Sequence, residues 1–281
     1  MSTPLLRVAT PDDLPELAAI YIDAVQTLGP TAYTAAQVTA WASWPTAEPT
    51  EFRRRLTAGH TWVAEVEGQI AAFAVYVQPD HLDFLYTRGA YARRGLAMLL
   101  HEKLEAIARD LCAPLLRTEA SYLSRPVFKK LGYRVMEIER VERFGETFTR
   151  FKMTKRLRVG APTTGPDLAV IEAHAASFAV TPHVEAESVV TLRRHDPDNP
   201  GWFSGNDAGG VPGYFPTAWF EIDESTQQAT AQRDYDAAEL DVVVGDQVHV
   251  AETIGNWCLV VTHNGLHEGW IPAACLPATR E

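Results

Sequence analysis

The sequence contains few cysteines and no long apolar run. Its three cysteines among 281 residues are odd in number and widely spaced, at Cys112, Cys258 and Cys275. That usage favours a reduced chain over a disulfide framework. No stretch approaches the roughly 18 apolar residues of a membrane-spanning helix, and the first residues lack the basic and then apolar pattern of a secretory leader. These absences predict a soluble, cytoplasmic protein that does not act in a membrane.

Positive charge is nearly missing from the C-terminal part of the chain. Residues 159–281 contain no lysine and 4 arginines against 18 acidic residues, whereas residues 1–158 hold 21 basic against 18 acidic residues. The whole chain has a formal net charge of −11. A nucleic-acid-binding protein usually shows a basic excess, so this balance argues against that class. The acidity belongs almost wholly to the C-terminal part, and it says little about what the first part binds.

The charge change coincides with a predicted domain boundary. Hydrophobic residues make up 46% of the chain, enough for packed cores, and a length prior of about 150 residues per domain suggests about two domains. Residues 159–167 are rich in Gly, Pro and Thr and lack apolar periodicity, so we interpret them as a linker. A shorter break falls at 224–228. We therefore expect three folding units, at 1–158, 168–223 and 229–278.

The first expected unit alternates helices and strands. Its strongest predicted helix covers 95–110, with Leu96, Leu100 and Leu104 on one face. Thr10 is a plausible N-cap with Pro11 at the first helical position, and Glu67-Gly68 is typical of a tight hairpin turn. The other expected helices cover 34–41, 50–56 and 125–131, and the expected strands cover 5–9, 61–66, 69–77, 82–87, 115–120, 133–139 and 147–153.

The turn before the strongest helix has the features of an anion site. Arg93 and Arg94 precede the helix, and Gly95 and Ala97 are small enough to let a ligand approach the backbone. Backbone N–H groups at a helix N-terminus can hold a pyrophosphate. An arginine pair before a helix is more often a solvated turn, so the pattern by itself leaves both interpretations open.

The order of elements, this turn and the segment SYLSRPVFKKLGYRV at 121–135 together resemble the GNAT acyltransferase superfamily over nearly all of residues 1–157. The family motif, Gln/Arg-x-x-Gly-x-Gly/Ala, falls on Ala92, Gly95 and Ala97, where Ala92 departs from the pattern. The resemblance, which is strongest to a bacterial branch acting on small molecules, implies an α/β fold with a mixed, splayed β-sheet flanked by helices. It also implies acetyl-CoA as co-substrate and transfer of an acetyl group to the amine of a small molecule.

The resemblance also implies where acetyl-CoA binds. It would lie between two splayed strands, 82–87 and 115–120, with the backbone of 93–98 on the pyrophosphate. Ser121 stands where many members have Asn. The cofactor-binding residues implied in this way are Leu85, Tyr86, Thr87, Arg93, Arg94, Gly95, Leu96, Ala97, Met98, Ser121 and Phe128.

The residue that would protonate the leaving thiolate is less obvious. Family members often place a tyrosine where this chain has Phe128, which cannot donate a proton. Either the thiolate leaves unaided, or Tyr122 or Tyr133 substitutes. No cysteine lies in the expected cleft, because Cys112 follows the helix, so direct transfer is expected without an acyl-cysteine intermediate.

Three residues are candidates for the general base. His81 and Asp83 share one face of a strand by its period of two, and Glu119 lies on the neighbouring strand. Each also has a structural interpretation, as a loop histidine, a strand-end cap and a structural acceptor. The N-terminal helices are implied to roof the acceptor pocket, which would be lined by Tyr33, Trp41, Trp44 and Trp62. No metal site is predicted, because His263 and His267 lie in a glycine-containing hairpin without a cysteine pair of zinc spacing.

The C-terminal part contains an internal repeat of about 55 residues with short strands and Gly-rich turns. Its second copy resembles an SH3 domain and its first copy a looser relative, which implies two small all-β SH3-like barrels. Such domains bind Pro-rich peptides between aromatic side chains, with acidic residues pairing a basic residue of the ligand. The implied groove residues are Trp202, Pro216, Trp219, Tyr235, Trp257 and Pro272.

Two alternatives stay open at this point. Arg233 and Cys275 stand where SH3 grooves usually have aromatics, so the modules could be structural or self-associating. Ala92 and Phe128 would also fit a non-catalytic scaffold protein with a degenerate transferase fold and a peptide-binding pair of modules.

Overall fold

The computed structural model describes residues 3–157, 167–263, 265 and 267–277. The chain forms two compact units: residues 1–134 with 138–157, and residues 135–137 with 158–281. The linker expected at 159–167 lies outside the described residues except for Asp167. Within the described ranges, no helix combines the length and the apolar character needed to span a membrane.

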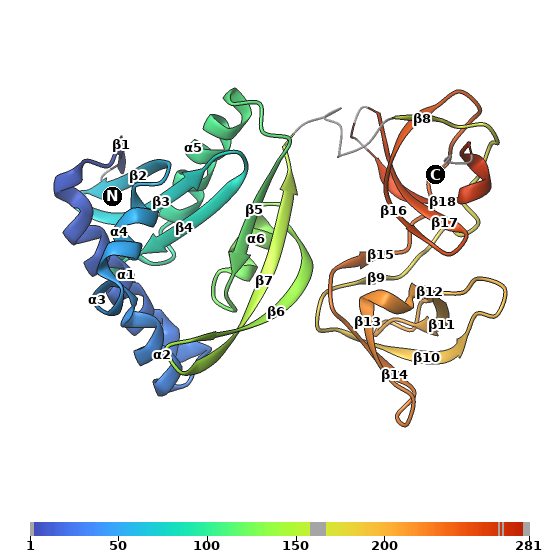
Figure 1. Cartoon of the computed structure of the whole chain (residues 1–281), viewed down its shortest axis with the longest axis horizontal. Coiled ribbons are helices and arrows are strands. Elements are labelled where there is room, and N and C mark those ends of the chain that lie inside the picture. Colours follow the sequence, from blue (N-terminus) through green and yellow to red (C-terminus); the bar gives the residue numbers. More distant parts are fainter. Residues whose placement is uncertain (1–2, 158–166, 264, 266, 278–281) are drawn as a thin grey trace. The chain divides into compact units, whose positions relative to one another are not determined.

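The first unit is a seven-stranded mixed sheet with helices, as the resemblance implied (Figure 1). The strand order is β1-β2-β3-β4-β5-β7-β6. The strands are β1 Leu5–Val8, β2 His60–Val66, β3 Gln69–Val77, β4 His81–Thr87, β5 Leu115–Ala120, β6 Arg134–Arg143 and β7 Glu146–Arg156. The helices are α1 Leu14–Leu28, α2 Ala35–Ala42, α3 Trp44–Ala47, α4 Pro49–Leu56, α5 Leu96–Asp110 and α6 Arg125–Lys130.

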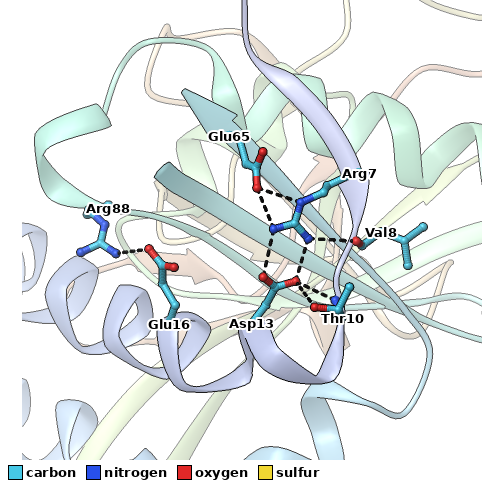
Figure 2. Close-up of polar contacts among 7 residues, drawn as sticks. All are labelled: Arg7, Val8, Thr10, Asp13, Glu16, Glu65 and Arg88. Carbon is cyan, nitrogen blue, oxygen red and sulfur yellow. Dashed lines mark hydrogen bonds and ion pairs between the residues drawn. The ribbon is translucent and has the colours of Figure 1, made fainter. Parts of the chain in front are cut away.

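An ion cluster fixes the start of this unit (Figure 2). The Arg7 guanidinium contacts a carboxylate oxygen of Asp13 at 2.7 Å and one of Glu65 at 2.6 Å. Asp13 also accepts hydrogen bonds from the Thr10 backbone N–H at 2.6 Å and from its hydroxyl at 3.0 Å. The predicted cap at Thr10 is confirmed: a short 3-10 turn, Pro11–Asp13, leads into α1. The cluster thus ties β1, β2 and the first helix together.

The main core of the first unit lies between α1 and the sheet. Alternate residues of β3, Phe73 and Val75, are fully buried and pack in one cluster with Leu17 and Tyr21 of α1. Helix α5 packs against β2, β3 and β4. Because β3 has neighbours on both faces, it is an almost continuous apolar run and not an alternating one.

Strands β4 and β5 meet at one step only. They run parallel, and their single register pair is His81 with Arg117. Strand β5 instead pairs along its full length, Leu115 to Ala120, with β7. The two strands therefore part after their first residues (Figure 1), which is the splay that the resemblance implied.

The second unit is all-β, as expected. Its three sheets have the orders β12-β11-β10-β14-β13, β15-β9 and β18-β17-β16-β8, and in the described part of the chain they form no closed barrel. The strands are β8 Leu168–Ala169, β9 His183–Val184, β10 Val189–His195, β11 Trp202–Asn206, β12 Pro212–Pro216, β13 Phe220–Asp223, β14 Gln228–Ala231, β15 Tyr235–Asp236, β16 Gln247–Ile254, β17 Trp257–Thr262 and β18 Glu268–Pro272.

Strand pairing in the second unit crosses the boundary expected between the repeats. Strand β14 pairs with β10 and β13, whereas β8 pairs with β16. The rings of Trp202 and Trp270, one from each repeat, pack edge to face with centroids 4.9 Å apart in a shared core. The division of this part into two SH3-like modules stays a prediction.

Candidate active site

A cavity of about 390 Å³ opens in the first unit. Its wall is formed by the N-terminal helices, by β4 and β5, and by the hairpin between β6 and β7. Eight aromatic side chains line it: Tyr21, Tyr33, Trp41, Trp44, Phe84, Tyr86, Phe144 and Phe148. The polar lining residues are Arg55, Asp83, Glu119, Ser121, Glu142, Arg143, Thr149 and Arg150. Of the acceptor-pocket residues named from the sequence, Tyr33, Trp41 and Trp44 line this cavity.

Glu119 and His81 form an ion pair at the cavity. His81 Nε2 lies 2.9 Å from a carboxylate oxygen of Glu119, and about a third of each side chain is exposed. The Glu119 carboxylate raises the pKa of His81, and His81 in turn lowers the pKa of Glu119. Glu119 lines the cavity and His81 lies behind it. A carboxylate that faces the cavity and has a titratable partner is suited to proton transfer.

Asp83, which also lines the cavity, is held by a different partner. Its two carboxylate oxygens face the Arg55 guanidinium, with Arg55 Nε 2.9 Å from one of them and Nη2 in contact with the other. The Arg55 guanidinium in turn lies over the rings of Trp44 and Phe84. Because the pair is bidentate and the Asp83 side chain is only 6% exposed, both carboxylate oxygens are engaged by Arg55 and are not open to a ligand.

The start of α5 presents a row of backbone donors. Gly95 caps the helix with a φ of 83°, and Arg93 has a φ of 62°, both left-handed. Among the described residues the first helical N–H with a backbone acceptor is that of Leu99, which donates to Gly95. The N–H groups of 93–98 are therefore available to an anion. A side chain at Gly95 would point into open space, so backbone conformation and not crowding requires glycine there.

The backbone of β4 presents a second set of free groups. Arg88 N–H donates to Ala71, and the register pairs Tyr86 with Phe73. Hydrogen-bonded and non-hydrogen-bonded pairs alternate in an antiparallel ladder. Leu85 and Thr87 are therefore non-hydrogen-bonded toward β3 and turn their peptide groups to the other edge, where β5 has parted. This gap fits an extended amide-bearing chain such as pantetheine.

Several other residues named from the sequence already have partners in the protein. The Ser121 hydroxyl lies 3.2 Å from that of Ser124 and accepts from the Ser124 N–H at the start of α6. The Tyr133 hydroxyl lies 3.0 Å from His101 Nε2, and Phe128 packs on the Tyr133 ring. Tyr133 and Phe128 are each 3% exposed and do not line the cavity. The Tyr133 hydroxyl therefore points to His101 and not into the cavity, and its role in protonating the thiolate stays a prediction.

Trp62 is a correction to the expected acceptor pocket. It is not among the lining residues, and the Lys103 ammonium of α5 lies 4.4 Å from its ring centroid. Successive side chains of β2 alternate between the two faces of the sheet, and Val63, not Trp62, belongs to the core shared with α1. The indole therefore lies on the face covered by α5.

Three arginines of the cavity, Arg55, Arg143 and Arg150, were not predicted as site residues. Arg55 follows the buried Phe52 by three residues in α4, a helical spacing that could have revealed it. Arg143 and Arg150 come from the charged hairpin formed by β6 and β7. Arg143 lies beyond the expected end of the first strand at 139, and Arg150 lies within the strand expected at 147–153, whose cavity-facing side the sequence does not indicate. Phe148 completes the aromatic wall.

A second cavity, of about 270 Å³, lies in the second unit. Six aromatic side chains line it: Phe178, Trp202, Tyr214, Tyr235, Trp257 and Trp270. Asp196 and Glu239 also line it, and its lining contains no Lys, Arg or His. Of the groove residues named from the sequence, Trp202, Tyr235 and Trp257 meet here. Pro216, Trp219 and Pro272 do not, and Trp219 instead lies under Arg233, with the guanidinium 3.8 Å from its centroid.

Comparisons with known proteins match the first unit. A family model described as Acetyltransferase (GNAT) domain matches residues 31–155. The uncharacterized N-acetyltransferase YafP of Escherichia coli (strain K12) is 29% identical over 148 residues, which cover 53% of this chain and 93% of the relative. The crystal structure of a GCN5-related N-acetyltransferase from Rhodopseudomonas palustris has 34% identity and a TM-score of 0.54. That match covers 56% of this chain and 98% of the solved one.

Proposed function

The chain belongs to the GNAT family of acetyltransferases, and from that premise we propose that its first unit moves the acetyl group of acetyl-CoA directly to the primary amine of a small molecule. The enzyme is an acyltransferase that uses acetyl-CoA. The observation that carries the proposal is the joining of three features. Glu119 lies beside the point where β4 and β5 part, the free backbone edge of β4 runs from that point toward Thr87, and α5 with its free N-terminus follows β4 along the chain.

The proposed cofactor site uses mainly backbone atoms. The peptide groups of Leu85 and Thr87 bind the amide-bearing arm, and the N–H groups of 93–98 bind the pyrophosphate. Arg93 and Arg94 are exposed beside that turn and add positive charge. Ala92 replaces a polar residue of the family motif, but the backbone donors do not depend on that side chain.

The proposed proton acceptor is Glu119, with His81 behind it. A protonated amine must lose a proton before its nitrogen can attack. When bound, acetyl-CoA supplies the acetyl group: a carbon–nitrogen bond forms, the carbon–sulfur bond breaks, and the second proton, which nitrogen loses on acylation, balances the charge gained by sulfur. Glu119 accepts the first proton, before attack, and shares it with His81, 2.9 Å away, whereas the second proton passes to the thiolate or to water. Asp83 takes a positioning role, because its carboxylate holds Arg55 against Trp44.

Binding of acetyl-CoA is the first test, by calorimetry on the full chain. We expect the native protein to bind and a Gly95→Glu variant to lose binding, because the new carboxylate would stand where the pyrophosphate is held. Gly68→Glu is the matched control: Gly68 has a φ of 79° and open space around it, like Gly95, but sits in the β2–β3 turn. Absence of binding by the native chain would overturn the catalytic proposal in favour of a scaffold.

A second candidate function concerns the second unit. We propose that its cavity binds a basic, Pro-rich peptide, because six aromatic rings and two carboxylates line it without a basic residue. Peptide binding should be lost in Phe178→Ala and kept in Val180→Ala. Phe178 and Val180 are 59% and 69% exposed, so neither change should disturb folding, and only Phe178 lines the cavity. Equal binding by both variants would favour a structural or self-associating role.

A further inference from the structure

Arg143 is the cavity-lining arginine with the weakest counter-ion. Its guanidinium lies 3.8 Å from a carboxylate oxygen of Glu48, at the limit of an ion pair and beyond hydrogen-bond distance. That same oxygen accepts the hydrogen bond of the Trp44 indole at 3.0 Å. Among the described contacts, the Arg143 side chain makes no hydrogen bond, and 46% of it is exposed. Its N–H donors are therefore free for a ligand.

The other two arginines of the cavity are neutralised within the protein. Arg55 is bound by both oxygens of Asp83. Arg150 donates from Nε and Nη2 to one oxygen of Glu139. Arg143 is held in a different way, because its guanidinium lies 5.2 Å from the Trp44 centroid and 5.4 Å from that of Phe144. Two rings thus hold the guanidinium in place and leave its edge free.

Arg143 lies far along the cavity from the reacting end. Glu119 faces Lys152 in the β5–β7 register, whereas Arg143 ends β6 opposite Glu146, the first residue of β7. The six steps from Lys152 to Glu146 along β7 span about 20 Å of strand at about 3.3 Å each. The side chains of Glu119 and Arg143 both line the cavity, so the distance between their charged groups is shorter than this backbone span. Aromatic side chains such as Trp41, Trp44 and Phe148 line the cavity wall.

We propose that the acceptor is an elongated primary amine with an anionic group at its far end. This inference rests on the proposed acetyl transfer: the amine lies at Glu119, a flat apolar body lies along the aromatic wall, and a carboxylate or similar anion is bound by Arg143. A planar guanidinium binds such a group with two parallel hydrogen bonds. The site then recognises both ends of one molecule.

Glu142 provides an internal check on the sign of the ligand charge. It also lines the cavity, is exposed, and directly precedes Arg143. If the far end of the acceptor were cationic, Glu142 would be the anchor and Arg143 would oppose binding. Glu142→Gln removes a negative charge and Arg143→Gln removes a positive charge at adjacent positions. The two variants therefore distinguish a cationic from an anionic far end of the acceptor.

The experiment compares paired acceptors on the full chain with acetyl-CoA. The probes are ω-amino carboxylates of increasing length, with and without a benzene ring in the chain, and the corresponding neutral ω-amino carboxamides. We expect an optimum length at which the carboxylate exceeds its carboxamide at least about tenfold in kcat/KM, since a charge-assisted hydrogen bond contributes about that factor. Binding is followed in parallel by quenching of tryptophan fluorescence with CoA present.

The variants then assign the preference to Arg143. Arg143→Gln should remove the preference by raising KM for the carboxylate about tenfold with little change in kcat, and Arg143→Lys should restore part of it. Glu142→Gln should retain or increase the preference. Arg53→Gln, at an exposed position of α4 outside the cavity, is the control for loss of one positive charge.

Every outcome of these measurements either supports or overturns the inference about the acceptor. Equal use of carboxylate and carboxamide, a preference that survives Arg143→Gln, or loss of binding in Glu142→Gln overturns the inference. So does failure of every ω-amino carboxylate to bind or react. Acetylation of uncharged amines under those conditions would leave the proposed transfer standing, whereas absence of acetyl-CoA binding would remove the transfer itself.

Discussion

His81 and Glu119 face each other across the last point of contact between two diverging strands. Their side chains meet at 2.9 Å, and the register pair of His81 with Arg117 is the only one that joins β4 to β5. Beyond it the sheet opens. The pair therefore lies at the start of the gap between the two strands, and Glu119 also lines the aromatic cavity, as the proposed proton acceptor should.

The pH dependence of kcat should reflect the protonation of the His81–Glu119 pair. Glu119 raises the pKa of His81 above its usual 6.5, and a protonated His81 cannot take up a further proton. We expect kcat, at saturating substrates, to rise with pH through an ascending limb above pH 6.5 whose apparent pKa belongs to the pair. In His81→Gln that limb should shift or disappear. An identical profile for both proteins would contradict the relay.

Removing the carboxylate should separate chemistry from cofactor binding. Glu119→Gln keeps the size of the side chain but cannot accept the amine proton, so kcat should fall about a hundredfold or more. Acetyl-CoA binding by calorimetry should persist, because the proposed cofactor contacts are backbone groups. Glu102→Gln, at an exposed position of α5, is the matched control. A kcat for Glu119→Gln close to that of this control would exclude Glu119 as the base.

Stability should depend on the buried imidazole of His101. Burial lowers the pKa of His101 to about 4, below the 6.5 expected in the unfolded chain. The unfolded state therefore binds more protons between these values, and stability rises with pH in that window, by up to about 3 kcal/mol overall. Urea unfolding at pH 5 and 6.5 should show this slope in the native protein.

A His101→Gln variant should show a smaller slope between those two pH values. His81 acts in the opposite direction, since its raised pKa stabilises the fold when it is protonated and this contribution is lost as pH rises. This loss falls mainly above pH 6.5, so a His81→Gln variant should lose less stability than the native chain when the pH is raised from 6.5 to about 8. An unchanged slope in His101→Gln below pH 6.5, or an unchanged loss in His81→Gln above it, would show that the imidazole concerned is not linked to folding.

The ion cluster at the first helix should contribute modestly to stability. Hydrogen bonding to Arg7 holds the pKa of Asp13 well below its usual range, so its contribution is present above about pH 4 and is lost on further acidification. At neutral pH Asp13→Asn should lower the free energy of unfolding by about 1 kcal/mol. The neighbouring Asp12→Asn serves as the control, and thermal unfolding of both variants measures the difference.

The sequence was sufficient to predict those structural features that depend on residues close together along the chain. The cap at Thr10, the Glu67-Gly68 turn with φ values of 54° and 79°, and the strand at Leu115–Ala120 follow from local residue types. The sequence did not predict which face of a strand a helix covers, or which distant segment a residue contacts. Period-two alternation puts Trp62 and Val63 on opposite faces of β2, but does not say which face α5 covers.

The charged hairpin shows a second reason for failure. We expected its first strand to end at 139, but β6 continues to Arg143 and turns at Phe144-Gly145, where φ values are 51° and 80°. The extension carries charged residues without apolar alternation, so hydrophobic pattern could not reveal it. In the second unit the repeat was visible, whereas the strand exchange between its halves depends on long-range pairing that periodicity does not encode.

Leu85 and Thr87 turn peptide groups, and not side chains, toward the gap beside β5. A ligand in this gap would be bound through backbone N–H and C=O groups, and every residue except proline has both. If acetyl-CoA is bound in this gap as proposed, side-chain substitutions along β4 should leave its binding unchanged. The same strand contributes Asp83 and Phe84 to the acceptor cavity. Side-chain changes at those positions would therefore alter which acceptor is acetylated and leave acetyl-CoA as the donor.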